Sequence, residues 1–204
     1  TTSPTSNGCT ACAAGTYKSV IGNSACVQVP AGSYPSKAMT ISSPVSGDWQ
    51  GITASPDFRY MAATVYAGSI YMSSDNGVTW TAQTTGTTAI FRALAFSSPT
   101  SGFAVGSGGT ICVYNGTTWT AQTSGTTADF TSVSVVGNTA WAVGAGGVIC
   151  RYNGTSWVTV NTGVTAAFRS VVIVNDNTIV ITGDGVLICQ SMDGGVTWQT
   201  QTVG

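Results

Sequence analysis

The 204-residue sequence contains no His and no Glu, and only 6% of its residues carry a charge. The absence of His excludes Ser-His-Asp and Cys-His nucleophiles, and it excludes His-ligated zinc sites. All seven acidic residues are Asp, and the six basic residues are scattered along the chain. Nucleic acid is therefore a poor partner, because a phosphate backbone requires a basic face. No apolar run approaches the roughly 20 residues that span a bilayer, so no membrane span is expected.

Most of the polar residues are uncharged, and Lys is rare. Three of the six cysteines lie near the N-terminus. This composition is typical of secreted proteins. The first residues have neither the basic nor the apolar region of a signal peptide, so we expect a mature extracellular product whose leader has been removed. A net charge of −1 provides little repulsion between copies. Such a surface is expected either to carry glycans or to associate.

A repeat of about forty residues covers most of the chain. Its clearest marker is a Trp that recurs at spacings of 39, 38 and 41 residues: Trp80, Trp119, Trp157 and Trp198. The repeat divides the chain into four units at about 49–85, 86–124, 125–162 and 163–204. An aromatic residue begins the first predicted strand of each unit: Trp49, Phe91, Phe130 and Phe168.

Each unit has the pattern of four short strands separated by turns. In the second unit the predicted strands are 91–96, 102–106, 110–114 and 118–123. Small residues follow the opening aromatic of each unit, which is typical of an innermost strand in a radial array. We therefore predict an all-β fold, a small β-propeller of about four four-stranded blades over residues 39–204. A β-sandwich with coincidental repetition is the alternative, and ring closure by four blades is left open.

The stretches "SSDNGVTW" (73–80) and "SMDGGVTW" (191–198) match the Asp-box S-x-D-x-G-x-T-W. The Asp-box is found in sialidase-type (BNR) propellers, and the whole unit also resembles the repeats of Ycf48-like photosystem assembly factors. In a structural role, the Asp accepts backbone N–H bonds, the Gly takes positive φ, and the Trp packs between blades. The motif residues are Ser73, Asp75, Gly77 and Trp80 in one copy, and Ser191, Asp193, Gly195 and Trp198 in the other. A calcium loop would need more carboxylates, so no metal is expected.

The middle units carry "YNGT" in place of the Asp-box, and there Tyr114 and Tyr152 are expected to replace the Asp. Asn115 and Asn153 each begin an N-x-[ST] sequon on an exposed hairpin, so both are predicted glycosylation sites. The alternative is that Asn-Gly is simply a good hairpin turn.

The sialidase resemblance implies an arginine cluster, a Tyr–Glu pair and an acid/base Asp. Because Glu is absent, the Tyr–Glu pair cannot form. Arg92 and Arg169 occupy equivalent first-strand positions, where they either line one face or lie isolated at blade edges. We predict no catalytic residues, no cofactor and no enzymatic activity, since the resemblance extends to the scaffold only.

The cysteines fall into two groups. Residues 9–34, "CTACAAGTYKSVIGNSACVQVPAGSY", resemble ephrin-receptor-like cysteine-rich modules, and this resemblance implies a Cys12–Cys26 disulfide that staples an N-terminal arm, residues 1–38. Cys9 is then left without its usual partner. The other group shares one position in successive units, where small buried side chains are expected: Cys112, Cys150 and Cys189, with Tyr71 in the first unit.

Residues 39–43 form an extra predicted strand ahead of the first unit. The strand either closes the ring beside the last blade or docks on another molecule. The leading hypothesis is a non-enzymatic extracellular structural glycoprotein that self-assembles through its arm into a filament or surface coat. One alternative is a carbohydrate-binding (lectin-like) propeller module. Another is a Ycf48-like assembly factor, but the sequence has no basic patch of the kind that this role would need.

Overall fold

The computed structural model describes residues 16–17, 27–28, 48–66, 68–185 and 187–202. The chain divides into two compact units, Thr1–Thr40 and Ile41–Gly204. In the first unit, β1 (Thr16–Tyr17) pairs antiparallel with β2 (Val27–Gln28). The Cys12–Cys26 disulfide, Cys9 and the strand at 39–43 lie outside the described residues. Within the described part of the chain, no helix is long and apolar enough to cross a membrane.

The second unit contains four antiparallel sheets of four strands each, which confirms the predicted all-β fold of a small β-propeller, and the array of sheets is open. The first sheet contains β3 (Trp49–Ala54), β4 (Met61–Val65), β5 (Ile70–Ser73) and β6 (Thr81–Gln83). The second contains β7 (Phe91–Ser98), β8 (Ser101–Gly106), β9 (Ile111–Tyr114) and β10 (Trp119–Gln122). The third contains β11 (Phe130–Val136), β12 (Thr139–Gly144), β13 (Ile149–Tyr152) and β14 (Trp157–Thr159). The fourth contains β15 (Phe168–Ile173), β16 (Ile179–Gly183), β17 (Leu187–Ser191) and β18 (Gln199–Thr202).

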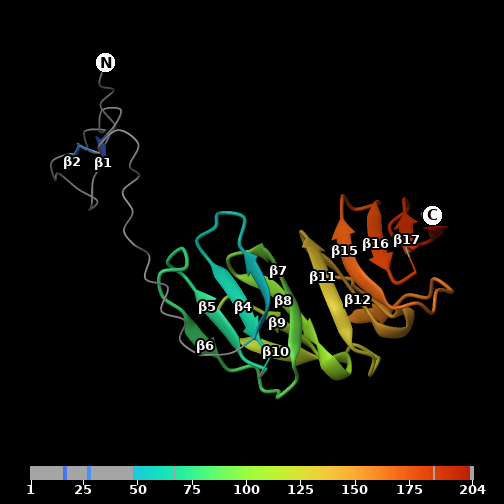
Figure 1. Ribbon diagram of the computed structural model, residues 1–204, viewed down its shortest axis with the longest axis horizontal. Coiled ribbons are helices and arrows are strands. Elements are labelled where there is room, and N and C mark those ends of the chain that lie inside the picture. The colour runs from blue at the N-terminus through green and yellow to red at the C-terminus, as the bar shows by residue number, and fades with distance from the viewer. Residues whose placement is uncertain (1–15, 18–26, 29–47, 67, 186, 203–204) are drawn as a thin grey trace. The chain divides into compact units, whose positions relative to one another are not determined.

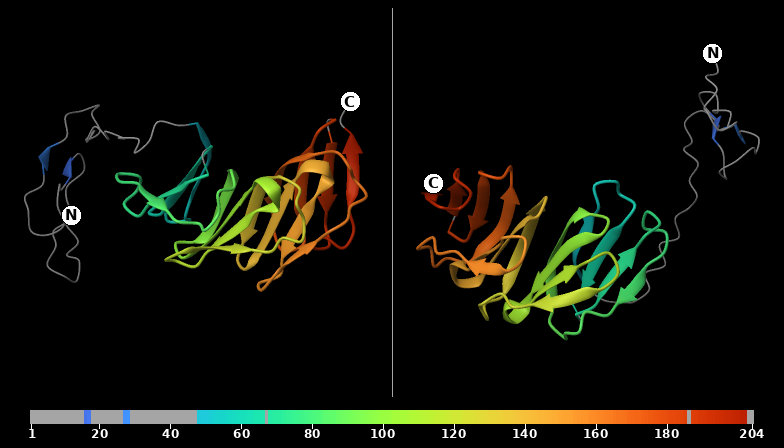
Figure 2. Two further views of the ribbon diagram at one scale, coloured as in Figure 1. Left: turned by 90° about the horizontal axis from the view of Figure 1, so that it is seen from below. Right: turned by 180° about the vertical axis from the view of Figure 1, so that it is seen from behind.

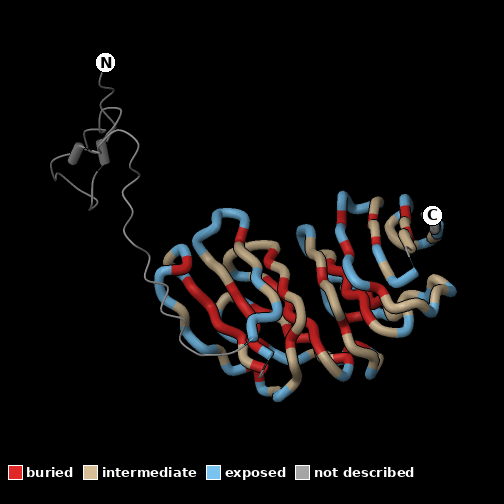
Figure 3. The backbone as a smooth tube through the Cα atoms, in the orientation of Figure 1, coloured by how far each residue is buried: buried red, intermediate tan, exposed pale blue. Residues whose placement is uncertain are grey.

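Successive sheets stack face to face, with the first and fourth sheets at opposite ends of the stack (Figure 1; Figure 2). We call the face of a sheet toward the following sheet its trailing face, and the opposite one its leading face. Three buried clusters fill the three gaps between sheets. The third, for example, joins Trp141, Val143 and Ile149 of the third sheet to Phe168 and Ile181 of the fourth. The burial colours of Figure 3 follow this arrangement, with red backbone concentrated inside the stack.

The first strands of neighbouring sheets approach closely, as their small residues predict. Contacts run from β3 to β7, from β7 to β11 and from β11 to β15. A Cβ on Gly51 would lie 2.9 Å from the carbonyl oxygen of Arg92 in the next sheet. The Ser132 and Ser134 hydroxyl oxygens accept the backbone N–H groups of Val171 (3.3 Å) and Ile173 (3.2 Å). Small side chains at these positions therefore set the distance between sheets.

Among the described residues, the two end faces of the stack have less apolar cover than the faces inside it. At the leading face of the first sheet, Ile52 is 72% exposed, whereas its counterparts Leu94, Val133 and Val171 are buried. At the trailing face of the fourth sheet, Val172 is 54% exposed. Both end faces are therefore open among the residues that the structure describes.

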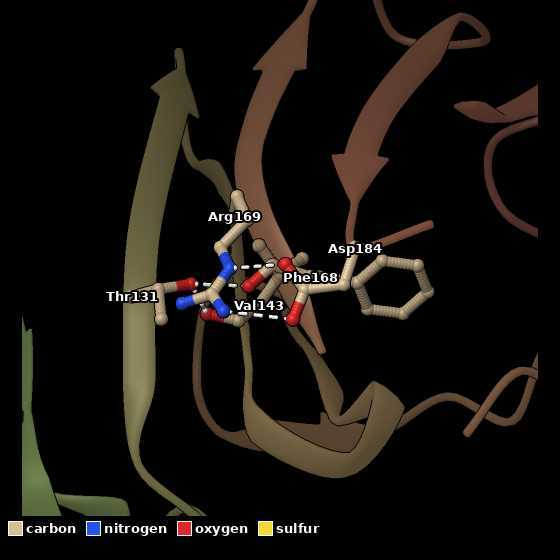
Figure 4. Close-up of polar contacts among 5 residues, drawn as sticks. All are labelled: Thr131, Val143, Phe168, Arg169 and Asp184. Carbon is tan, nitrogen blue, oxygen red and sulfur yellow. Dashed lines mark hydrogen bonds and ion pairs between the residues drawn. The ribbon is translucent and has the colours of Figure 1, made fainter. Parts of the chain in front are cut away.

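A hydroxyl provides a further link between the third and fourth sheets. Thr131 Oγ1 donates to the carbonyl oxygen of Phe168 (2.7 Å), and it also lies 3.1 Å from the carbonyl oxygen of Val143 (Figure 4). Thr131→Val keeps the side-chain shape but removes this donor, and it should lower the free energy of unfolding by about 1 kcal/mol. Urea denaturation measures the difference. Thr120→Val, at an exposed position of β10, is the matched control and should change stability by less than about 0.5 kcal/mol. Equal stabilities of the two variants would contradict the link.

Candidate functional site

The first Asp-box forms a closed turn between β5 and β6. The Asp75 carboxylate accepts the backbone N–H of Thr79 (2.8 Å) at Oδ1 and the Thr79 hydroxyl (2.7 Å) at Oδ2. The Ser73 hydroxyl donates to Asp75 Oδ1 (2.8 Å) and accepts the N–H of Gly77 (2.9 Å). The Trp80 indole N–H then donates to the carbonyl oxygen of Gly77 (3.0 Å). Both carboxylate oxygens are thus bound within the turn itself.

The second Asp-box repeats this geometry between β17 and β18. Asp193 accepts the N–H and the hydroxyl of Thr197, and the Ser191 hydroxyl accepts the N–H of Gly195 (2.8 Å). These bonds stabilise the ionised carboxylate. The bonds from Thr79 and Thr197 accordingly lower the pKa of Asp75 and of Asp193 to about 2. A carboxyl that stays ionised in this way is a poor general acid at neutral pH.

The recurring Trp packs each sheet onto the preceding one. The Trp119 indole N–H points at Met72 Sδ of the first sheet (3.4 Å). The Trp157 ring meets Phe103 of the second sheet at a centroid distance of 5.4 Å. Trp198 meets Trp141 of the third sheet at 5.6 Å, again edge to face. The first-sheet counterpart, Trp80, has no preceding sheet among the described residues and is half-buried.

The middle hairpins differ from the Asp-box in length, which corrects the predicted alignment of Tyr114 and Tyr152 with the Asp. Tyr114 pairs with Gly102 as Ser73 pairs with Met61, so the Tyr occupies the position of the Ser. Six residues separate Ser73 from Trp80, but only four separate Tyr114 from Trp119. An alignment anchored on the Trp places Tyr114 opposite Asp75 and so hides the two missing loop residues. The strand register reveals them, because it fixes which residue ends the third strand of each sheet.

Asn115 and Asn153 take over the locking role of the Asp in these shorter hairpins. The Asn115 side-chain oxygen accepts the N–H groups of Thr117 (3.0 Å) and Thr118 (2.9 Å). The Asn153 oxygen accepts those of Thr155 (3.0 Å) and Ser156 (3.0 Å). Both Asn residues are exposed. The bonds use the amide oxygen, so the nitrogen that would carry a glycan faces no competing bond within the described residues.

The arginines predicted at equivalent positions do not share one site. Arg92 pairs with Asp129 of the third sheet (3.2 Å), whereas Arg169 pairs with Asp184 of its own sheet (2.6 Å; Figure 4). The N–H of Gly108 and the Arg92 side chain lower the pKa of Asp129, and Arg169 lowers that of Asp184. In the described part of the chain, no three His, Cys, Asp or Glu side chains gather as metal ligands would.

The cysteines at one register position are buried thiols. Cys112 pairs with Ala104, Cys150 with Ala142 and Cys189 with Ile181, and Tyr71 holds the same register position in the first sheet. All three thiols are free. Burial raises the pKa of Cys112 and of Cys150 to about 11, and it raises that of Cys189 as well. These thiols therefore act as small core side chains, as predicted, and not as nucleophiles.

Two shallow grooves lie at matching positions of the first and second sheets. One, of about 690 Å³, runs between residues 108–111 and 121–127. The other, of about 590 Å³, runs between residues 68–69 and 83–88. Thr, Ser, Gly and Gln dominate both linings, and neither contains an aromatic side chain. Sequence reasoning missed these grooves, because they form from loops of ordinary turn composition.

Comparison with known proteins shows the fold and leaves the family open. No protein family matches the sequence, and no curated protein does. The solved structures that resemble the chain are propellers of varied roles. YCF48 from Cyanidioschyzon merolae is 14% identical with a TM-score of 0.61, over 79% of this chain and 58% of that one. The Niastella koreensis GH74 enzyme is 17% identical with a TM-score of 0.61, over 74% of this chain and 29% of that one.

A further similar structure is the outer coat vertex of COPII on membranes, 13% identical with a TM-score of 0.62. The match covers 78% of this chain and 51% of that chain. This chain thus spans less than two thirds of the length of these structures. It is a propeller-type protein by fold.

The Asp-box turns should determine how the stability of the fold decreases at acidic pH. The folded-state pKa values of Asp75 and Asp193 lie near 2, below the ordinary 3.8, so their stabilisation is complete above about pH 4 to 5 and is lost as pH falls toward 2. With neither His nor Glu in the chain, Tm should stay nearly constant between about pH 5 and 7. Asp75→Asn with Asp193→Asn should flatten the acid limb in calorimetry at fixed ionic strength. An unchanged limb would place the acid sensitivity elsewhere.

Gly195 should tolerate substitution less well than a glycine in an open turn. Its φ is +89°, and a Cβ there would overlap the Trp141 indole. Gly163 also has positive φ, +75°, but a Cβ added there would have no other atom within 4 Å. Gly163→Ala should cost about 1–2 kcal/mol from backbone strain alone. Gly195→Ala should cost about 1–3 kcal/mol more from overpacking, measured by urea denaturation. Equal losses would mean that the Trp141 contact adds nothing.

Proposed function

We propose that the protein is a non-enzymatic extracellular structural glycoprotein whose copies assemble into a filament or a surface coat. The observation that carries the proposal is the open stack of sheets, in which no other described residues cover the face at either end. Ile52 is 72% exposed where its counterparts Leu94, Val133 and Val171 are buried, and Val172 is 54% exposed. Exposed sheet faces of this kind favour association.

The carboxylates support a non-enzymatic role. Catalysis at neutral pH by Asp residues needs side chains that are free to exchange protons or attack a substrate. Asp75 and Asp193 are engaged by their turns, and Asp129 and Asp184 by arginines. The Asp57 carboxylate accepts a hydrogen bond from the Ser55 hydroxyl. The Asp-box resemblance therefore extends to a scaffold in which five of the seven carboxylates are bonded within the fold.

The extracellular and glycoprotein parts rest on other observations. The sequons at Asn115 and Asn153 lie on exposed hairpins, in register on neighbouring sheets. The ephrin-receptor-like cysteine pattern, with the Cys12–Cys26 disulfide that it implies, is typical of secreted modules. In this proposal the arm, residues 1–38, connects one copy to the next.

A lectin-like module is the second candidate, and the two matching grooves favour it. Their hydroxyl and backbone groups offer hydrogen bonds to a sugar. Lectin activity predicts retention on a glycan array by a monomer or a closed oligomer. Assembly predicts particles that grow with concentration.

Electron microscopy of the purified full-length protein over a concentration series tests the assembly. We expect filaments or sheets, and discrete monomers at high concentration would contradict the proposal. Removal of residues 1–43 should abolish the polymers and preserve the β-sheet circular dichroism. Polymers that persist after this deletion would exclude the arm as the connector. Mass spectrometry before and after glycosidase treatment, with Asn115→Gln and Asn153→Gln as controls, tests the glycans.

A further inference from the structure

An ion pair joins the second sheet to the third. Arg92, the second residue of β7, reaches Asp129, which immediately precedes the opening residue of β11. The Arg92 Nη2 atom lies 3.2 Å from Asp129 Oδ2, and the N–H of Gly108 donates to Asp129 Oδ1 (2.8 Å). The Asp at the entry of a sheet thus binds two groups of the preceding sheet.

An Arg and an Asp at equivalent positions are also present at the two ends of the stack, the Arg on the fourth sheet and the Asp on the first. Arg169 is the second residue of β15, as Arg92 is of β7. Asp48 immediately precedes the opening residue of β3, as Asp129 precedes that of β11. The Arg169 side chain is 61% exposed although it pairs with Asp184. Asp48 is exposed and has no ion pair within the part of the chain that the structure describes.

The neighbouring positions match in the same way. Between the third and fourth sheets, the Ser132 hydroxyl accepts the N–H of Val171. Ser170 holds the place of Ser132 on the fourth sheet, and Ile52 holds the place of Val171 on the first. Ser170 is exposed, and Ile52 is 72% exposed. The trailing face of the fourth sheet and the leading face of the first therefore carry complementary charge, hydrogen-bonding and apolar groups.

We infer that a second copy of this chain docks head to tail, with the trailing face of its fourth sheet on the leading face of the first sheet of its neighbour. Arg169 of one copy pairs with Asp48 of the next, in the geometry of Arg92 and Asp129. The inference rests on the proposed self-assembly and adds a contact surface to it. The partner is a second copy of this chain, because its two end faces carry the same groups that pair between its second and third sheets and between its third and fourth sheets. Such a contact is heterologous, so it closes into a ring or continues as a filament.

Charge reversal tests the contact in the full-length protein. Asp48→Arg or Arg169→Asp brings like charges together, and each should weaken self-association by about tenfold or more. The double variant restores opposite charges across the contact and should recover association to near the wild-type level. Sedimentation velocity over a concentration series measures all four proteins, and rising salt should reduce the differences.

Asp176→Arg is the matched control, because it changes the net charge as Asp48→Arg does. Asp176 is exposed and lies in the loop that follows β15, whereas Arg169 lies at the beginning of that strand. This variant should associate as the wild type does. Circular dichroism at neutral pH checks that every variant is folded, which separates lost docking from lost structure.

The possible results test the docking contact and the proposed function separately. Single variants that associate as the wild type does, or a double variant that does not recover, would overturn the docking. If filaments also persist unchanged in the single variants, the structural function stands while this contact is wrong. Closed rings that depend on both charges, without filaments, would support the contact and contradict the filament. A wild type that stays monomeric would overturn both.

Discussion

Face-to-face packing of sheets is the constraint on which the remaining structure depends. A four-stranded sheet of this size cannot bury both apolar faces alone, so each sheet needs a neighbour on either side. The small residues of the first strands permit the approach, as Gly51 does for Arg92 and Ser132 for Val171. The recurring Trp then fills the outer part of each gap. Turn chemistry, charge placement and the exposed ends all follow from this stacking.

Much of the fold could be predicted because the repeat is visible in the sequence. Trp spacing and small first-strand residues predicted four sheets and their innermost strands, and the cysteine register was also correct. The shorter middle hairpins were not predicted, because residues of similar type flank loops of different length. The pairing of Arg92 with Asp129 was missed for a different reason. It depends on how neighbouring sheets are stacked, and no local pattern encodes that distance.

Function is less predictable than fold here, because the most recognisable motif serves the scaffold. The carboxylate of an Asp-box could in principle bind a metal or a substrate, but its acceptor capacity is taken up by Thr, Ser and backbone groups of one turn. In the shorter hairpins of the middle sheets, an Asn amide oxygen accepts the backbone N–H groups of the turn instead. The repeat thus keeps a turn held by one side-chain acceptor, while the loop shortens by two residues and the acceptor changes from a carboxylate to an amide.

The buried thiols have a consequence for how the chain matures. At neutral pH, a thiol with a pKa near 11 is thiolate in only about one molecule in ten thousand, and thiolate is the species that attacks disulfides. Once the sheets have stacked, Cys112 and Cys150 are therefore withdrawn from thiol–disulfide exchange. Before stacking they are ordinary reactive thiols. In the proposed secreted protein, these thiols would therefore compete for the N-terminal cysteines only until the sheets have stacked.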